Sequence, residues 1–190
     1  MNIAILALHV TSYMLHDFMN SKGFTLIELL VTIAVISIIS AVLLVGRGKE
    51  EERLSLGRSA FKLSQDLREV QEMVMGANSA TCTPGVTYSF GVYFDQTSPD
   101  SYLVFANCNN DNKIKDSSDK ILKEVKLEKK VKIKNLSFSP LNIVFVAPDP
   151  TTFINEVSWN TEGVISLGLK SDPSQQKTVK INTAGRIEIE

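Results

Sequence analysis

The sequence predicts an α+β fold in which a long N-terminal helix precedes an antiparallel β-sheet domain. Residues 24–46 are almost uniformly apolar, and beyond them apolar residues recur every three or four positions up to about residue 77. That spacing is typical of an amphipathic helix. From residue 85 onward, apolar and polar residues alternate, which is the period of a half-buried strand. A helix followed by a run of strands is an α+β arrangement.

The composition excludes several classes of protein. Of 190 residues, 44 % are apolar and 22 % are charged, and the net charge is −1. These values fit neither a disordered chain nor a polytopic membrane protein, and they argue against a dedicated nucleic-acid binder. The two histidines, His9 and His16, both precede the apolar run. Removal of the N-terminus would leave no histidine for a Ser-His-Asp, Cys-His or His-metal site, and we expect no enzyme.

The apolar run has the length of a membrane-spanning helix. As a helix, residues 24–46 would extend ~34 Å at ~1.5 Å per residue, enough to cross a bilayer. A buried core helix would be shorter and less uniform. A cleavable secretory signal would end in a small-x-small site, whereas this run continues into a charged helix. We therefore expect residues 24–46 to be the transmembrane half of the helix and residues 47–80 its amphipathic half.

One carboxylate interrupts the apolar run. Glu28 is the only charged residue between positions 24 and 46. A carboxylate in hydrocarbon costs about 2.5–3.5 kcal/mol on insertion scales, so it needs a cationic partner or a function. The nearest cation would be a free α-amine created just before Phe24.

The residues around Glu28 resemble a known processing signal. Residues 21–30, SKGFTLIELL, are similar to the type III signal of type IV pilins and type II secretion pseudopilins. The resemblance implies that a prepilin peptidase cuts between Gly23 and Phe24 and that Phe24 is then N-methylated. It also implies that Glu28 acts in assembly by pairing with the Phe24 amine of a neighbouring subunit. The partners implied are the peptidase, other pilin or pseudopilin subunits, the inner-membrane assembly platform and membrane lipid.

The leader departs from the family in its length. A prepilin leader over residues 1–23 is long, and Met14 or Met19 would give a shorter one. The true start codon, Met1, Met14 or Met19, is left open.

The charges beside the apolar run do not agree with the resemblance. Before the run the nearest basic residue is Lys22, and Arg47, Lys49, Arg53 and Arg58 follow it. By the positive-inside rule alone the C-terminal part would be cytoplasmic. The resemblance implies the opposite, because the peptidase cuts on the cytoplasmic face. We therefore expect a single-pass protein of the cytoplasmic (inner) membrane with residues 81–190 extracytoplasmic, later part of a pilus or pseudopilus.

The second half of the helix should pack on the domain that follows. An apolar stripe with spacings of three and four consists of Leu56, Ala60, Leu63, Leu67, Val70, Val74 and Ala77. We expect one helix from Phe24 to about Gly76, bent at Gly46 and Gly48. The residues expected to end it are Gly76, Asn78 and Pro84.

The remaining residues predict one sheet of seven or eight short strands. A hairpin is expected from residues 86–94 and 102–105 around a turn at 97–100. Further strands are expected at residues 121–127, 131–138, 143–146, 156–159, 164–169, 178–181 and 186–189. Two turns of the form Asn-Thr-x-Gly end at Gly163 and Gly185, where positive φ is expected. Trp159, on one of these strands, should lie in the core. The layout resembles the GspH/FimT group of minor pilins and pseudopilins.

Residues 107–119 resemble a calcium loop. The side-chain oxygens expected to bind calcium belong to Asn107, Asn109, Asp111, Asp116 and Asp119. Asn112 replaces the usual glycine and Ser118 the usual glutamate at position twelve. The alternative is a polar turn after a strand.

Two further features have competing interpretations. Cys82 and Cys108 could form a disulfide if the domain is exported, or could stay unpaired near two strand ends. Residues 113–134 hold nine lysines against four acids. They could contact DNA through Lys126, Lys130, Lys132 and Lys134, as in minor pilins that take up DNA. They could equally be a solvated sheet face or a lysine-protected edge strand.

The function expected from these observations is structural. The chain is predicted to be a minor pilin or pseudopilin of a type IV pilus or a type II secretion filament. One alternative is a DNA-uptake minor pilin that binds DNA through its basic strand. Another is a membrane-anchored extracytoplasmic binding domain with an uncleaved anchor.

Overall fold

The protein is described by a computed structural model that covers residues 23–45, 47–82, 85–108, 113–147 and 151–190. The predicted leader before Gly23 lies outside these residues. The chain divides into two compact units, residues 1–47 and residues 48–190, and each is considered by itself.

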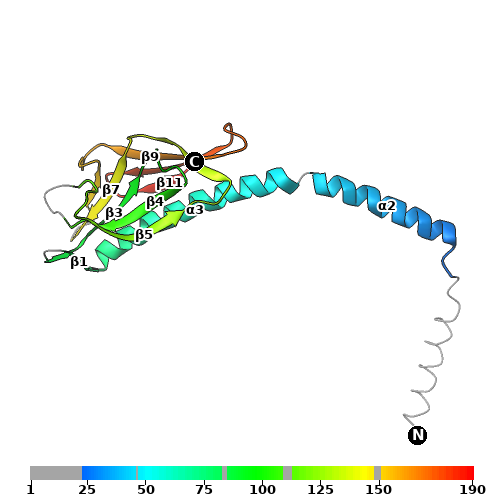
Figure 1. Cartoon of the computed structure of the whole chain (residues 1–190), viewed down its shortest axis with the longest axis horizontal. Helices are drawn as coiled ribbons and strands as arrows, with labels where there is room; N and C mark the ends of the chain where they lie inside the picture. Colours follow the sequence, from blue (N-terminus) through cyan, green and yellow to red (C-terminus); the bar gives the residue numbers. More distant parts are fainter. Residues whose placement is uncertain (1–22, 46, 83–84, 109–112, 148–150) are drawn as a thin grey trace, which may run out of the picture. The chain divides into compact units, whose positions relative to one another are not determined.

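The described part of the first unit consists of residues 23–25 and the helix α2 (Leu26–Val45) (Figure 1). Large apolar side chains along this helix are exposed, for example Leu26 at 81 % and Val42 at 71 %. Its hydroxyl groups are satisfied within the helix, because Thr32 and Ser37 donate to the carbonyl oxygens of Leu29 and Ile33 at 2.8 Å each. Among the residues that the structure describes, no helix combines the length and the apolar character required of a membrane span.

The second unit begins with the amphipathic helix α3 (Arg47–Met75). The predicted helix appears as two helices, α2 and α3, and Gly46 between them lies outside the described residues. The predicted stripe is confirmed at six of its positions, where side chains from Leu56 to Val74 are at most 4 % exposed. Ala77, the seventh, is exposed because it lies beyond the end of the helix.

The helix ends at Met75, and a Schellman turn follows it. The Asn78 amide donates to the carbonyl oxygen of Met73 at 3.0 Å, and the Ala77 amide to that of Val74 at 3.1 Å. These are the two hydrogen bonds of that motif. Ala77 takes the left-handed conformation, with φ of 51°. The sequence predicted that Gly76, Asn78 and Pro84 end the helix, but the residue with the left-handed conformation is Ala77.

The strands form three antiparallel sheets (Figure 1). The five-stranded sheet has the order β5-β4-β3-β7-β8, and the four-stranded sheet has the order β11-β10-β9-β6. A short hairpin, β1-β2, precedes them. In chain order the strands are β1 (Ala80–Cys82), β2 (Gly85–Thr87), β3 (Ser89–Phe94), β4 (Ser101–Ala106), β5 (Lys120–Lys126), β6 (Val131–Leu136), β7 (Leu141–Val146), β8 (Thr151–Ile154), β9 (Glu162–Leu169), β10 (Gln176–Asn182) and β11 (Ile187–Ile189).

One hydrophobic core joins α3 to both large sheets. It includes Leu63 and Leu67 from the helix, Phe90 and Phe145 from the five-stranded sheet, and Leu167 from the four-stranded sheet. The α+β fold, with a helix packed on antiparallel sheets, is therefore confirmed. The prediction of a single sheet is wrong, because β6 leaves its neighbour in sequence, β5, and pairs with β9 instead.

The predicted strand at residues 156–159 is also wrong, and so is the buried position of Trp159. The chain turns sharply after β8, where Asn155 and Glu156 have φ of 44° and 68°. The Asn155 side chain fixes this turn, since its oxygen accepts a hydrogen bond from the Asn142 amide at 2.7 Å. Trp159 follows in a loop and is 75 % exposed.

The two Asn-Thr-x-Gly turns differ from each other. Gly185 has the expected positive φ, 78°, but Gly163 lies inside β9. In that turn Asn160 takes the positive φ, 44°. A β-carbon at position 163 would lie 3.2 Å from the Ile181 side chain.

We expect Gly91→Ala to destabilise the second unit by about 1–3 kcal/mol, the usual cost of overpacking a core. Gly91 lies in the central strand β3, and a β-carbon there would lie 2.7 Å from the Phe105 ring and 2.8 Å from the Ile143 carbonyl oxygen. Gly57→Ala in α3 is the matched control, because nothing lies within 4 Å of its β-carbon position. Urea denaturation of both variants is the measurement, and equal free energies of unfolding would contradict the expected clash.

Candidate processing and assembly site

The segment with the predicted cleavage site enters α2 through a reciprocal pair of hydrogen-bonding residues. The Thr25 hydroxyl accepts a hydrogen bond from the Glu28 amide at 3.3 Å. Glu28 Oε2 accepts from the Thr25 amide at 3.4 Å and from the Thr25 hydroxyl at 3.3 Å. This is a capping box, which satisfies two amide donors that have no partner within the helix. Thr25 and Glu28 therefore fix where α2 begins.

The predicted cleavage bond lies just outside this cap. Phe24 is 79 % exposed. Around Gly23, no described atom beyond its chain neighbours lies within 4 Å of the position that a β-carbon would occupy. The bond between Gly23 and Phe24 is thus open to approach within the first unit, and the cap does not use the Phe24 backbone nitrogen.

The Glu28 carboxylate keeps one oxygen for a further partner. As a cap it uses Oε2 alone, and Oε1 accepts no hydrogen bond from the described residues. The carboxylate also lies in the first turn of α2, where the partial positive charge of the helix end favours an anion. The site can therefore hold a carboxylate in place and still present an oxygen to a cation.

A comparison with protein families identifies this segment. The family described as "Prokaryotic N-terminal methylation motif" matches residues 18–44. Residues 18–44 therefore carry a prokaryotic N-terminal methylation motif. The resemblance predicted from the sequence is confirmed over these residues, which include Gly23, Phe24 and Glu28.

Two solved structures are distantly similar to this chain. The type IV minor pilin FimU of Pseudomonas aeruginosa (strain PAO1) is 13 % identical, with a TM-score of 0.49 over 73 % of this chain and 90 % of that one. The minor pseudopilin EpsH from the Type 2 Secretion System of Vibrio cholerae is 13 % identical, with a TM-score of 0.47 over 72 % of this chain and 96 % of that one. No curated protein sequence matches the chain. Both structural likenesses are distant, so the methylation motif is what identifies the segment.

The capping role of Glu28 was absent from the sequence prediction. The signal was present, because a threonine followed three residues later by a glutamate, before an apolar run, is the sequence pattern of a capping box. The prediction treated Glu28 only as a carboxylate in need of an external cation. The structure gives it a partner within its own helix as well.

The two cysteines are joined. Cys82 at the end of β1 and Cys108 after β4 form a disulfide, with their Cα atoms 5.5 Å apart. The bond ties the β1-β2 hairpin to the five-stranded sheet. Closing a loop of this sequence separation, 26 residues, is worth about 3.5 kcal/mol in the chain-entropy account.

The expected calcium ligands are only partly described. Asn109 and Asp111 lie outside the described residues. Both carboxylate oxygens of Asp119 accept backbone hydrogen bonds, from Cys108 at 2.8 Å and from Asp116 at 2.9 Å. Asn107 is buried, and its carbonyl oxygen accepts from the Thr87 hydroxyl at 2.7 Å. Within the described ranges no three acidic, histidine or cysteine residues gather as a metal site, and calcium binding stays a prediction.

The four lysines of the predicted DNA-contacting strip do not lie on one strand. Lys126 ends β5, in the five-stranded sheet, whereas Lys132 and Lys134 lie on β6, in the four-stranded sheet. Lys134 donates hydrogen bonds to the Pro173 carbonyl at 2.8 Å and to the Gln176 side chain at 2.9 Å. Lys130 lies 3.8 Å from Glu52. Two of the four ammonium groups are thus already engaged within the protein.

The other interpretation of these lysines fits β5. This strand pairs only with β4 and is the edge of its sheet. It carries Lys120, Lys123 and Lys126. Lysines on an exposed edge discourage pairing with a second sheet.

We expect Thr25→Ala to fray the start of α2, because the Glu28 amide loses its cap. Loss of an N-cap costs about 0.5–2 kcal/mol, so hydrogen exchange at the Glu28 amide should quicken roughly 2- to 30-fold. Thr25→Ser keeps a hydroxyl and is the matched control. The measurement is amide exchange of the full chain in detergent micelles, and unchanged exchange in Thr25→Ala would show that the cap contributes nothing.

If calcium binds between Asn107 and Asp119, a chelator should lower the melting temperature of the full chain in detergent. A ligand that binds only the folded state stabilises it by an amount that rises with the logarithm of the free ligand concentration relative to Kd, and its removal reverses the effect. Asp111→Asn should melt at the same temperature with and without chelator. The absence of a shift in the unsubstituted protein would end the calcium hypothesis.

Proposed function

We propose that this chain is a structural subunit, a minor pilin or pseudopilin, of a type IV pilus or type II secretion filament. The observation that carries the proposal is the methylation motif over residues 18–44. The α+β architecture of the second unit, with a long helix packed on antiparallel sheets, supports it. The assignment to a minor subunit rests on the resemblance to the GspH/FimT group. The role is one of assembly, and it requires no catalytic step by this chain.

Processing comes first in the proposed sequence of events. Prepilin peptidase cuts between Gly23 and Phe24 and methylates the new Phe24 amine, which keeps its ability to carry a positive charge. Glycine before the cut lets the peptidase approach the backbone closely, because it has no side chain. The exposure of Phe24 supports this step.

Assembly then uses the charge created by cleavage. The Phe24 amine of one subunit pairs with Glu28 of its neighbour, which removes two isolated charges from an apolar environment together. The free Oε1 of Glu28 supports this pairing, since the cap can persist while a second contact forms. The contact fixes the axial stagger between subunits.

Before assembly the subunit is held in the cytoplasmic membrane. This part of the proposal concerns the whole apolar segment 24–46, including the residues that flank α2, and it is supported by the exposed leucine, isoleucine and valine side chains along that helix. In this arrangement the second unit is extracytoplasmic. Membrane lipid and the inner-membrane assembly platform are then its partners until neighbouring subunits replace the lipid. A disulfide between Cys82 and Cys108 is in keeping with an oxidising compartment.

The alternatives differ in the N-terminus and in the lysines. A membrane-anchored binding domain would keep residues 21–23 and would not need Glu28. A DNA-uptake subunit would bind DNA in a salt-dependent way through its basic residues. The engagement of Lys130 and Lys134 with protein groups favours the structural subunit over DNA uptake.

We expect the protein extracted from native membranes to begin at Phe24 and to carry one additional methyl group. The measurement is mass spectrometry of the N-terminal peptide. Gly23→Ala is the control, since a methyl side chain at the cut should leave the precursor uncleaved. A mature chain that still carries Ser21, Lys22 and Gly23 would remove the support for filament assembly and favour the anchored binding domain.

A further inference from the structure

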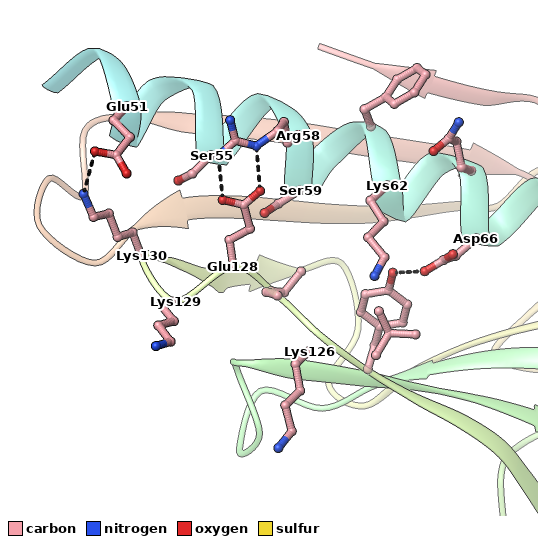
Figure 2. Close-up of a pocket in the computed structure, with 15 residues that line it drawn as sticks. Glu51, Ser55, Arg58, Ser59, Lys62, Asp66, Lys126, Glu128, Lys129 and Lys130 are labelled. Atoms are coloured by element: carbon pink, nitrogen blue, oxygen red, sulfur yellow. Dashed lines mark hydrogen bonds and ion pairs between the residues drawn. The ribbon is translucent and has the colours of Figure 1, made fainter. Parts of the chain in front are cut away.

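A groove runs along α3 on the side that faces the end of β5 and the connection from β5 to β6 (Figure 2). Its volume is about 930 Å³, comparable to that of sites that hold sizeable ligands. On the helix it extends from Glu51 to Asp66, and on the other side it is lined by every residue from Val125 to Lys130. This stretch consists of the end of β5 and the turn that follows it, in which the Val131 amide donates to the Glu128 carbonyl oxygen at 2.8 Å.

The groove combines apolar surface with one unsatisfied polar group. Phe61, Val125 and Leu127 supply apolar lining. Ser59 also lines it and is 4 % exposed, and its hydroxyl has no hydrogen-bond partner among the described residues. A buried hydroxyl without a partner is costly and uncommon. A ligand that supplied an acceptor or a donor at this point would remove that cost.

Two ion pairs tie the walls of the groove together. Arg58 donates two hydrogen bonds to the Glu128 carboxylate, at 2.8 and 3.0 Å. This bond lowers the pKa of Glu128 and raises that of Arg58. Lys130 lies 4.0 Å from Glu51. Figure 2 shows both contacts reaching across from α3 to the connection between β5 and β6.

The inner end of the groove is closed by a buried acidic group. The Tyr102 hydroxyl donates to Asp66 Oδ2 at 2.5 Å, and Lys123 lies 3.7 Å from the other oxygen of Asp66. Burial is the main cause that raises the pKa of Tyr102, and the hydrogen bond to Asp66 raises it further. Asp66 is therefore already engaged by two partners and is not available to a ligand cation.

Three lysines of the groove remain without an acidic partner in the described part of the chain. They are Lys62, Lys126 and Lys129. Lys62 extends from α3 into the groove, and the side chains of Lys126 and Lys129 point away from α3 at its outer edge (Figure 2). Once the internal ion pairs are subtracted, the unmatched charge of the groove is positive. Charge complementarity then calls for an acidic ligand.

We propose that this groove binds an extended, acidic segment of another polypeptide, with its apolar side chains against the half-buried Leu127 and its carboxylates toward the three lysines. A nucleic acid fits less well, because a continuous row of phosphates offers nothing to the apolar lining of Phe61, Val125 and Leu127. A peptide can instead place single carboxylates at the rim and present backbone groups to the Ser59 hydroxyl. The inference concerns the second unit alone and does not depend on the proposed processing of the N-terminus.

The test is binding of a fluorescein-labelled peptide of alternating glutamate and valine to the full chain in detergent micelles, followed by fluorescence anisotropy. We expect saturable binding that weakens at least about tenfold in the double variant Lys62→Glu, Lys129→Glu, which corresponds to about 1.4 kcal/mol or more. The matched control is Lys132→Glu, Lys177→Glu, which changes the net charge equally on the four-stranded sheet. Circular dichroism checks that each variant is folded.

A second variant separates binding from simple charge attraction. Ser59→Ala removes a buried hydroxyl without a partner, so it should leave the free energy of unfolding equal or higher while weakening the peptide roughly 2- to 13-fold. Equal loss of affinity in both lysine double variants, no saturable binding, or unchanged affinity in Ser59→Ala would each overturn the proposal. Tighter binding of a DNA duplex through Lys62 and Lys129 would replace the peptide with a nucleic acid.

Discussion

The second unit depends on burial of one face of α3. Leu63, Leu67 and Val70 of that face are at most 1 % exposed and share a core with residues of both large sheets. Strand pairing cannot replace this contact, because no pair of described strands joins the two large sheets. Full burial of one leucine contributes about 1.5–3 kcal/mol. The helix thus shares one core with both large sheets.

Periodicity predicted the elements that have one buried face. The α3 stripe and the hairpin of β3 and β4 were readable because their apolar residues recur at 3.6 or 2 positions. Sheet membership was not readable. The sequence between Leu127 and Lys130 does not indicate that β5 and β6 lie in different sheets. The reason is that β6 pairs with β9, a contact between residues far apart in the sequence. The strand expected at Trp159 fails for a local reason, the positive φ of Asn155 and Glu156.

The candidate site was predictable in its residues and only partly in its geometry. Gly23, Phe24 and Glu28 follow from a short contiguous pattern, which a sequence displays completely. The cap between Thr25 and Glu28 also follows from a local sequence pattern. The sequence analysis missed it because it explained Glu28 only as a charge in an apolar run that needs an external cation. The groove beside α3 could not be predicted, because it joins Ser59 and Lys62 to residues more than sixty positions later.

The disulfide has a mechanical consequence for a subunit that is held at one end. A pulling force applied through α3 and the C-terminal strands reaches the chain at Cys82 and leaves it at Cys108, so the covalent bond bypasses residues 83–107. At ~3.3–3.6 Å per residue, about 85 Å of contour length is withheld from extension. The withheld part contains β3 and β4, two inner strands of the five-stranded sheet. Tension along the chain therefore cannot extend this pair of strands unless the disulfide is reduced.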